Sequence, residues 1–284
     1  MLTLLIALTQ ATGLPSSRHR IDSLAASIPG RVGAAAMIIE TGAVVSTHGN
    51  ERFPMQSVYK LPIAMAVLQR IDAGKLKLGE EIHIKQSDMI PGVHSPIRDM
   101  TPAGTRLSTR ELLRSAIVES DGVASDMLLV WSPPAEVTKM LRKAKVDSMA
   151  VATTERAMAA DPMVQYKNWS TPLGAVQLLR ALQAGRALSA PSRALLMGWL
   201  TETTIGEKRI KVLLPAGTAV AHKTGTANTR NGLTRATNDI GIATLPNGQH
   251  LAIAVFIRDS KATEAQRETV IARIARVAWD AAKH

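Results

Sequence analysis

Ser57 and Lys60 are the first residues in the chain whose types and spacing could do chemistry, because they form its single S-x-x-K motif. A spacing of three on a helix brings both side chains to one face. A serine hydroxyl becomes a nucleophile when a base removes its proton, and a desolvated lysine can be that base. If Ser57 begins a helix, backbone N–H groups also point at an incoming carbonyl oxygen. Alone, the motif fits a helix-capping serine beside a solvated lysine equally well.

Two further motifs follow in the chain, Ser120-Asp121-Gly122 at a break between predicted helices and Lys223-Thr224-Gly225 on a predicted strand. Neither is evidence alone, since Ser-Asp pairs recur at 87–88 and 125–126 and a strand lysine commonly protects a sheet edge. Their order, S-x-x-K, then S-D-x, then K-T-G, is typical of class A β-lactamases and penicillin-binding proteins. The ordered set predicts acyl transfer on a serine.

The elements that must position these motifs divide the chain into strand-rich ends and a helical middle. Strands are predicted on both sides of the turn 40–42, over 218–226, and on both sides of 246–248, where an Asn-Gly step favours turn residues with positive φ. A Thr263-x-x-Gln266 capping box begins a terminal amphipathic helix. Helical periodicity and caps in the middle predict helices at 57–73, 108–118, 122–131, 172–184 and 191–201.

Because the two strand-rich ends must pair to complete one sheet, we predict an α/β (α+β) fold. Its antiparallel sheet is flanked by N- and C-terminal helices. Residues 18–50 and 205–284 form the α/β domain, and an inserted all-α domain, 51–204, includes the loop that carries Glu155. Residues 1–17 read as an atypical signal or leader segment, because an apolar run at 2–8 precedes small residues but lacks a basic start.

Composition limits the other function classes. The 34 Lys and Arg against 23 Asp and Glu give +11, which permits a polyanionic partner, but aromatic residues make up only 3% of the chain and supply few base-stacking platforms. The absence of Cys excludes disulfides, thiolate metal sites and a thiol nucleophile, and the seven His contain no H-x-x-x-H pair. We therefore expect no cofactor, no metal and no nucleic-acid partner. No apolar run is long enough to span a membrane.

The chain resembles the class A serine β-lactamases, nearest to the PER-like extended-spectrum group, from about Asp22 to the C-terminal helix. Besides the three motifs, the resemblance rests on six segments: 53–57 (FPMQS), 165–169 (QYKNW), 202–204 (ETT), 214–217 (LPAG), 221–226 (AHKTGT) and 236–239 (ATND). It implies a periplasmic or secreted, monomeric hydrolase of β-lactam antibiotics. It also implies an acyl-enzyme intermediate and no cofactor.

The resemblance also implies a role for each site residue. Ser57 attacks the lactam carbonyl, and Lys60, or Glu155 through a water, takes its proton. Ser120 protonates the leaving nitrogen while Lys223 adjusts the acidity of Ser120, and Glu155 activates the water that releases the acyl group. Backbone N–H groups of Ser57 and Thr226 form the oxyanion hole. The substrate-binding residues are Thr224, Gly225, Thr226, Arg209, Gly122 and His94.

Three departures from the family pattern put turnover in doubt. Gly122 stands where relatives have an Asn that contacts the substrate's acyl amide, and Ala159 where they have Asn or His near the hydrolytic water. We expect the first to slow acylation and the second deacylation. Pro62, inside the nucleophile helix, could bend its first turns. The alternatives are a penicillin-binding or acyl-trapping relative with poor deacylation, and a non-catalytic basic binding protein on the same fold.

Overall fold

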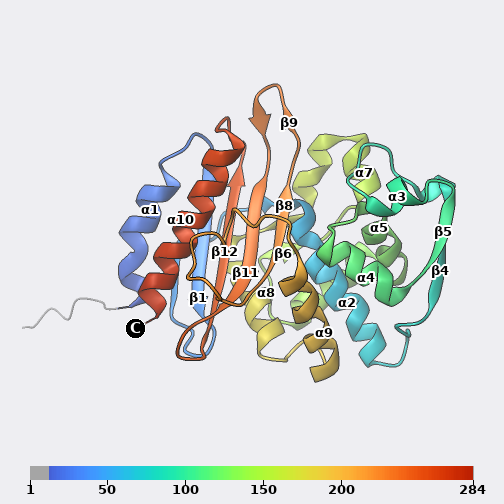
Figure 1. The fold of residues 1–284 in the computed structure, drawn as a ribbon, viewed down its shortest axis with the longest axis horizontal. Coiled ribbons are helices and arrows are strands. Elements are labelled where there is room, and N and C mark those ends of the chain that lie inside the picture. The colour runs from blue at the N-terminus through green and yellow to red at the C-terminus, as the bar shows by residue number, and fades with distance from the viewer. Residues whose placement is uncertain (1–12, 284) are drawn as a thin grey trace, which may run out of the picture.

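The computed structural model describes residues 13–283, which form a central antiparallel sheet with helices on both faces (Figure 1). The sheet has five strands in the order β2-β1-β12-β11-β8. Their bounds are Arg31–Ile38 for β1, Val44–Thr47 for β2, Val220–Thr226 for β8, Thr237–Thr244 for β11 and His250–Arg258 for β12.

The two ends of the chain meet in this sheet, as the sequence predicted. β1 pairs with β12 along its whole length, from Arg31 opposite Arg258 to Ile38 opposite Leu251. The β11–β12 connection differs from the expected turn, because Gly248 has positive φ and Asn247 does not. A two-residue turn of type I′ needs positive φ at both central positions. Here residues 245–249 form a longer loop instead, closed by the Leu245 N–H donating to the Gln249 carbonyl.

Both faces of the sheet are buried, so its central strands are apolar on both sides. In β12, Leu251, Ile253, Val255 and Ile257 face one core cluster, and Ala252, Ala254 and Phe256 face the other. The first cluster lies under α1 (Arg18–Ala25) and α10 (Glu264–Ala282), which run side by side in Figure 1. The predicted capping box begins α10. An N-terminal helix was also predicted, but without bounds, because α1 carries only a short apolar stripe.

Part of the predicted leader segment belongs to this layer. A 3-10 turn, Leu14–Ser17, precedes α1, and Leu14 is buried in the cluster beneath α10. Residues 1–12, the first part of that predicted segment, lie outside the described residues. Within 13–283, none of the helices combines the length and apolarity that a membrane crossing requires.

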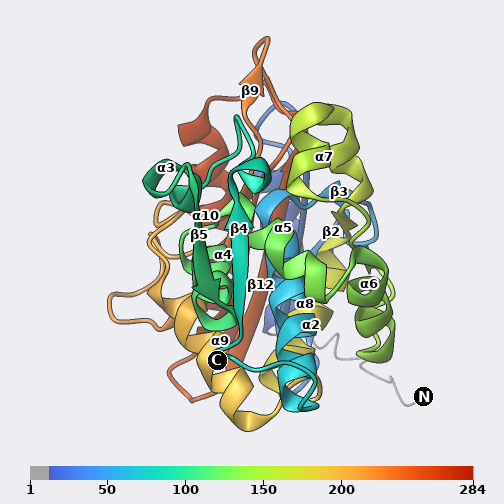
Figure 2. The ribbon, with the colours of Figure 1, turned by 90° about the vertical axis from the view of Figure 1, so that its right-hand side faces the viewer.

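The other face carries the helical side of the molecule, where α2 packs against α4, α5, α6 and α9 (Figure 2). The helices are α2 (Lys60–Asp72), α3 (Pro96–Met100), α4 (Thr109–Val118), α5 (Gly122–Trp131), α6 (Pro134–Lys143), α7 (Glu155–Ala160), α8 (Pro172–Gln183) and α9 (Ala190–Glu202). Helix α8 lies directly against strands of the sheet.

Short strands also occur here, so residues 51–204 are not purely helical. β4 (Glu81–Lys85) pairs with β5 (Gly104–Ser108), and β3 (Phe53–Pro54), β7 (Trp169–Ser170) and β6 (Met149–Ala150) form a small three-stranded sheet. A further hairpin, β9 (Thr229–Arg230) with β10 (Leu233–Thr234), follows β8. Strands of two to five residues carry too little periodicity for sequence patterns to detect them.

The nucleophile helix begins differently from the prediction. A 3-10 turn, Gln56–Tyr59, contains Ser57, and the α-helix starts only at Lys60. Pro62 is therefore the third residue of α2, where the first N–H groups of an α-helix have no partner within it. The missing N–H of Pro62 is tolerated there, and we see no reason to assign it a bend.

Candidate active site

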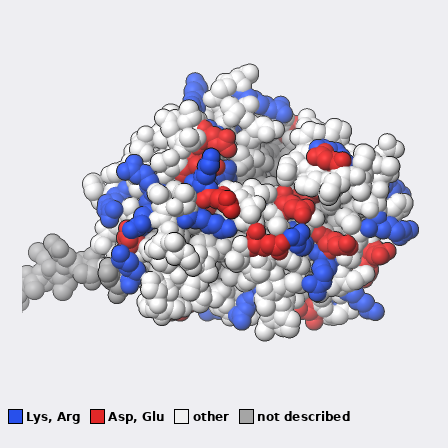
Figure 3. Space-filling model, viewed as in Figure 1, with Lys and Arg blue, Asp and Glu red and all other residues white. Residues whose placement is uncertain are grey.

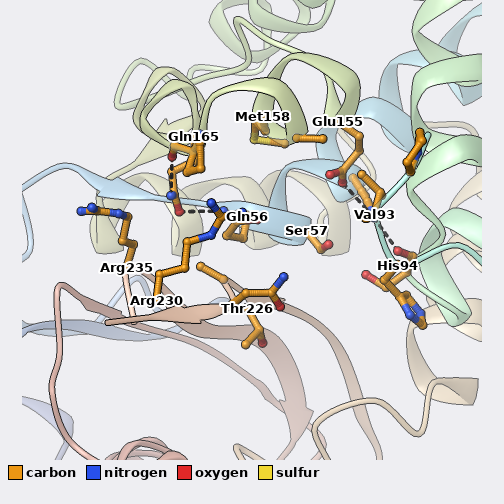
Figure 4. A pocket seen from close by; sticks show the side chains of 18 residues that line it. Gln56, Ser57, Val93, His94, Glu155, Met158, Gln165, Thr226, Arg230 and Arg235 are labelled. Atoms are coloured by element: carbon orange, nitrogen blue, oxygen red, sulfur yellow. Dashed lines mark hydrogen bonds and ion pairs between the residues drawn. The ribbon is translucent and has the colours of Figure 1, made fainter. Parts of the chain in front are cut away.

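A cavity of about 220 Å³ lies between the end of β8, helix α7 and residues 91–94 (Figure 4). It brings together residues from two of the three motifs, from the segment that carries Glu155, and Thr226, which directly follows the third motif. Seven residues singled out in the sequence line it: Ser57, Lys60, His94, Ser120, Glu155, Ala159 and Thr226. Five others that were predicted as site residues lie behind this lining: Gly122, Arg209, Lys223, Thr224 and Gly225.

The turn that carries Ser57 is held from the sheet. The Asn238 side chain, on β11, donates to the carbonyl of Pro54 at 2.8 Å and to that of Met55 at 3.1 Å. Gln56, immediately before the nucleophile, has φ +46°, a conformation that non-glycine residues rarely adopt. Such strain persists where surrounding contacts impose it. Asn238 thus fixes the backbone next to Ser57, a role that its sequence position alone did not indicate.

Gly225 brings β8 against the same turn. A Cβ at this position would lie 2.2 Å from the carbonyl oxygen of Met55, so only glycine fits. This close approach sets the Ser57 backbone beside Thr226, whose side chain is exposed at the cavity. Gly225 was predicted as a substrate-binding residue; in the structure its lack of a side chain lets β8 approach the turn that carries Ser57.

Lys60 is a buried cation with two oxygen partners. Its Nζ lies 3.1 Å from Oε1 of Glu155, and it also donates to the backbone carbonyl of Ser120. Lys60 is 2% exposed, and a charge at that depth is tolerated only when it is paired and hydrogen-bonded. The ammonium group thus joins the S-x-x-K motif to the S-D-x motif and to Glu155.

Lys223 approaches the same serine from the sheet. Its Nζ donates to Oγ of Ser120 at 2.9 Å, so the two lysines contact the hydroxyl and the carbonyl of one residue. Burial lowers the pKa of Lys223 well below the ordinary lysine value, and the positive charge of Lys60 lowers this pKa further. A lysine with a lowered pKa can exchange a proton with a neighbouring hydroxyl. Ser120 itself has φ +58°.

Asp121 explains how Ser120 keeps that conformation. Its carboxylate is fully buried and accepts from the Ala124 N–H, which caps α5, and from the Ile97 N–H and the Ser95 hydroxyl. The Asp of the S-D-x motif therefore anchors the break between α4 and α5 to α3. This anchoring leaves the Ser120 side chain directed at Lys223 and the cavity.

Glu155 is the first residue of α7, and Asp126 on α5 caps that helix. The Asp126 carboxylate accepts from the Glu155 N–H at 2.7 Å and from the Arg156 N–H at 3.0 Å. Burial raises the pKa of Asp126 to about 6, with the negative charge of Glu155 adding to the rise and the two N–H groups opposing it. Ser125-Asp126 had appeared in the sequence only as a chance repeat of the Ser-Asp pair, so this residue was missed.

Arg209 contacts the cavity only through another residue. Its guanidinium donates to Oγ1 of Thr226 at 2.8 Å and lies 3.2 Å from the Glu268 carboxylate. It is 4% exposed and supports Thr226 from behind. Direct pairing of Arg209 with a substrate carboxylate was implied by the family pattern, and this geometry instead favours an action through the Thr226 hydroxyl.

Gly122 corrects an expectation from the sequence. A Cβ at Gly122 would lie 2.1 Å from Cγ1 of Val93 and 3.3 Å from the carbonyl of His94. The side chain of Val93 therefore occupies the space that a side chain at position 122 would need, and Val93 lines the cavity. The Gly122 N–H donates to the His94 carbonyl at 2.9 Å, so Gly122 acts through packing and cannot offer a side chain to a substrate.

His94 and Ala159 lie at the cavity as expected. The Nε2 of His94 is 2.9 Å from the carbonyl oxygen of Glu119. Ala159 is exposed and presents only a methyl group, so the expectation of slower deacylation stays a prediction. In the part of the chain that the structure describes, no three His, Cys, Asp or Glu side chains gather as metal ligands.

Known proteins share both the sequence and the fold. Residues 16–282 match the model of the β-lactamase enzyme family. The chain is 37% identical over 267 residues to extended-spectrum β-lactamase PER-1 of Pseudomonas aeruginosa, covering 93% of this chain and 87% of that protein. A crystal structure of a β-lactamase from Chitinophaga pinensis is 47% identical, with TM-score 0.90 over 93% of this chain and 98% of the other. The crystal structure of the TLA-3 extended-spectrum β-lactamase is 38% identical, with TM-score 0.91 and coverage of 94% and 98%.

Asp126 predicts a pH-dependent stability. Its pKa is about 6 in the folded state and near 3.8 when unfolded, so its contribution to the free energy of unfolding is full below pH 4 and is lost as the pH rises through 6. The loss amounts to at most about 3 kcal/mol. We expect urea unfolding of Asp126→Asn to show a flatter pH dependence between pH 4 and 7. The exposed Asp147→Asn is the control, and an unchanged slope in Asp126→Asn would contradict the assignment.

Val93 makes Gly122→Asn a harmful change. Overpacking of this kind costs about 1–3 kcal/mol of stability, and displacement of Val93 into the cavity should slow acylation. The double variant Gly122→Asn with Val93→Ala should recover part of both losses, because it vacates the space that Cγ1 fills. Chemical unfolding and pre-steady-state acylation rates measure the two effects. Faster acylation by the single variant at unchanged stability would restore the original expectation.

Proposed function

The chain belongs to the β-lactamase enzyme family as a PER-like class A serine β-lactamase, and we propose that it hydrolyses β-lactams through an acyl-enzyme on Ser57. Hydrolysis of β-lactams is the activity of this class, and this chain is an enzyme of the class. The contact that supports the mechanism most directly is the Lys60 ammonium, which lies 3.1 Å from the Glu155 carboxylate and binds the Ser120 carbonyl. The Lys60 ammonium thus links the groups required for acylation and for deacylation.

Acylation uses the residues around Ser57. The Oγ of Ser57 attacks the lactam carbonyl carbon, and its proton passes to Glu155 through a water, or to Lys60 once the Lys60 ammonium has given a proton to the Glu155 carboxylate. The carbonyl oxygen becomes an oxyanion that the N–H groups of Ser57 and Thr226 stabilise, which is effective because the turn and strand hold them in place before reaction. The C–N bond of the lactam then breaks, and the leaving nitrogen takes the proton of the Ser120 hydroxyl.

Lys223 restores the proton of Ser120, and the proton taken from Ser57 passes on to Lys223 through water, so that Glu155 is again a carboxylate before deacylation. Its Nζ already donates to Oγ of Ser120 at 2.9 Å, and its lowered pKa makes proton transfer to that oxygen favourable. The carboxylate of the substrate binds beside Thr226 and Thr224 at this end of the cavity. Arg209 orients the Thr226 hydroxyl there and adds positive charge behind it.

Deacylation depends on Glu155. Its buried carboxylate lines the cavity with Ser57 and takes a proton from a water that attacks the ester carbonyl. The ester bond breaks, and Glu155 returns the proton to Ser57 through Lys60. The cap by Asp126 holds Glu155 at the start of α7, so the carboxylate approaches the acyl group from a fixed backbone.

A second candidate is an acyl-trapping relative, which the methyl group of Ala159 favours because it offers the hydrolytic water no hydrogen bond. The binding of an extended polyanion has less support. Figure 3 shows acidic and basic side chains interspersed across the middle of one face, although basic ones gather over α1 and α10. We place the enzyme in the periplasm or outside the cell as a monomer, with small β-lactams as its partners.

Ser57→Ala should abolish covalent chemistry, because no other serine has a lysine three residues later. Incubation with benzylpenicillin followed by intact-mass spectrometry should show no adduct, and nitrocefin turnover should fall by at least about a thousandfold. Ser87→Ala, an exposed serine, is the matched control. A single-site drug adduct on the Ser57→Ala protein would refute the nucleophile.

Glu155→Gln should acylate and then release product slowly, since glutamine keeps the shape of the side chain but cannot accept the proton of water. We expect a drug adduct to persist in the mass spectrum after excess drug is removed, with deacylation slowed by about a hundredfold or more. Glu80→Gln at an exposed site is the control. Steady-state turnover equal to that of the unaltered enzyme would contradict the role of Glu155 in deacylation. A persistent adduct on the unaltered enzyme would favour the trapping relative.

A further inference from the structure

A second cavity, a groove of about 400 Å³, lies between α1, α10 and the segment around Leu213 that precedes β8. None of the residues that line this groove also lines the active-site cavity. The volume is within the range of pockets that hold small molecules. The reaction described above makes no use of the groove, so its side chains call for a separate explanation.

The two helices present the same pair of side chains to the groove. Helix α1 contributes Arg20 and Leu24, and helix α10 contributes Arg273 and Val277. Residues four apart lie on one face of a helix. Both arginines are exposed, whereas Leu24 is half-buried and Val277 is buried. The groove therefore has a basic rim and an apolar floor.

The third wall of the groove extends this apolar floor. The Arg276 guanidinium donates to the Leu213 carbonyl at 3.0 Å and to the Asp280 carboxylate at 2.8 Å, which holds the segment around Leu213 against α10. The side chain of Leu213 lines the groove and is 40% exposed. A single exposed apolar side chain is ordinary on a protein surface. This one continues an apolar floor that two other elements have already formed.

The charge on the rim has no counter-ion in the protein. Among the described residues, those that line the groove include no Asp or Glu. Within residues 13–283, neither Arg20 nor Arg273 makes a salt bridge. Figure 3 shows basic side chains gathered over α1 and α10. Two guanidinium groups are therefore available to an anion from outside the chain.

We infer that this groove binds a small amphiphilic anion, in which a carboxylate or phosphate head is attached to an alkyl chain. The head pairs with Arg20 and Arg273, because a guanidinium forms charge-assisted hydrogen bonds with either group. The chain covers Leu24, Leu213 and Val277, because burial removes its apolar surface and theirs from water. This inference goes beyond β-lactam hydrolysis and does not depend on it.

An amphiphilic anion reaches a protein either as a free molecule or as a lipid within a bilayer. The burial of the floor favours the free molecule. Val277 is buried and Leu24 half-buried, while the arginines of the same helices are exposed. A flat bilayer surface would contact the exposed guanidinium groups and leave the floor uncovered, whereas a single alkyl chain fits between the helices.

Isothermal titration with monomeric decanoate at low ionic strength measures this binding. We expect one site with a Kd of about 0.1–1 mM. Octanoate is shorter by two CH₂ groups and should bind about four- to fifteenfold more weakly, because each buried CH₂ strengthens binding about two- to fourfold. Decyltrimethylammonium has a similar chain and a cationic head, and it should not bind. Added salt should weaken the binding of decanoate.

Substitutions on the rim test the head group. Arg20→Gln with Arg273→Gln should raise the Kd of decanoate about three- to tenfold, the range expected for two exposed ion pairs. Arg106→Gln with Arg110→Gln removes the same charge from exposed positions on β5 and α4 and should leave the Kd unchanged. An equal rise of the Kd in both double variants would show a general charge effect and overturn the inference.

A substitution on the floor tests the alkyl chain. Leu213→Asn should reduce the difference in Kd between decanoate and octanoate, because the longer chain loses an apolar contact. Val212→Asn is the matched control, since Val212 is 53% exposed and does not line the groove. Equal chain-length dependence in Leu213→Asn and the unaltered protein would contradict the assigned position of the chain.

Vesicles separate the two sources of the anion. We expect decanoate to bind while phosphatidylglycerol vesicles do not sediment with the protein at physiological salt. Sedimentation with vesicles in the absence of decanoate binding would overturn the groove in favour of a membrane surface. The failure of β-lactam hydrolysis is a separate result, because no β-lactam is present in these measurements.

Discussion

The buried ammonium of Lys60 is the constraint around which the site is arranged. A cation that is 2% exposed must be paired, and its partners come from a helix break at Ser120 and from the start of α7 at Glu155. Deleting the Glu155 side chain would leave the buried ammonium without a counter-charge, which is strongly destabilising. The segments that hold Ser120 and Glu155 are therefore bound to the nucleophile helix by the same contact that serves the chemistry.

The surrounding scaffold keeps this contact in one geometry. Asp121 and Asp126 use carboxylates to cap α5 and α7, so the backbones of Ser120 and Glu155 are fixed before substrate arrives. Asn238 and Gly225 press the sheet against the turn of Ser57. Such positioning matters because oxyanion stabilisation requires donors that are already oriented when charge develops. The cost appears as positive φ at Gln56 and Ser120 and as a raised pKa at Asp126.

The two buried lysines bind different groups of Ser120. Lys60 binds its carbonyl and stays paired with Glu155, whereas Lys223 binds its hydroxyl with a pKa lowered by burial and by the charge of Lys60. One lysine is thus neighbour to a carboxylate and the other to a hydroxyl.

Local sequence determined most elements and indicated the residues that we propose to react. The capping boxes of α4 and α10 and the ordered motifs follow from short-range patterns, and the pairing of the strand-rich ends was predicted because the two ends must meet to complete one sheet. Tertiary structure alone decided the rest. Val93 fills the space beside Gly122, Arg209 lies behind Thr226, and Asp126 caps α7. Each depends on a contact between residues 17 to 29 positions apart, and no local periodicity or spacing encodes which side chain will arrive there.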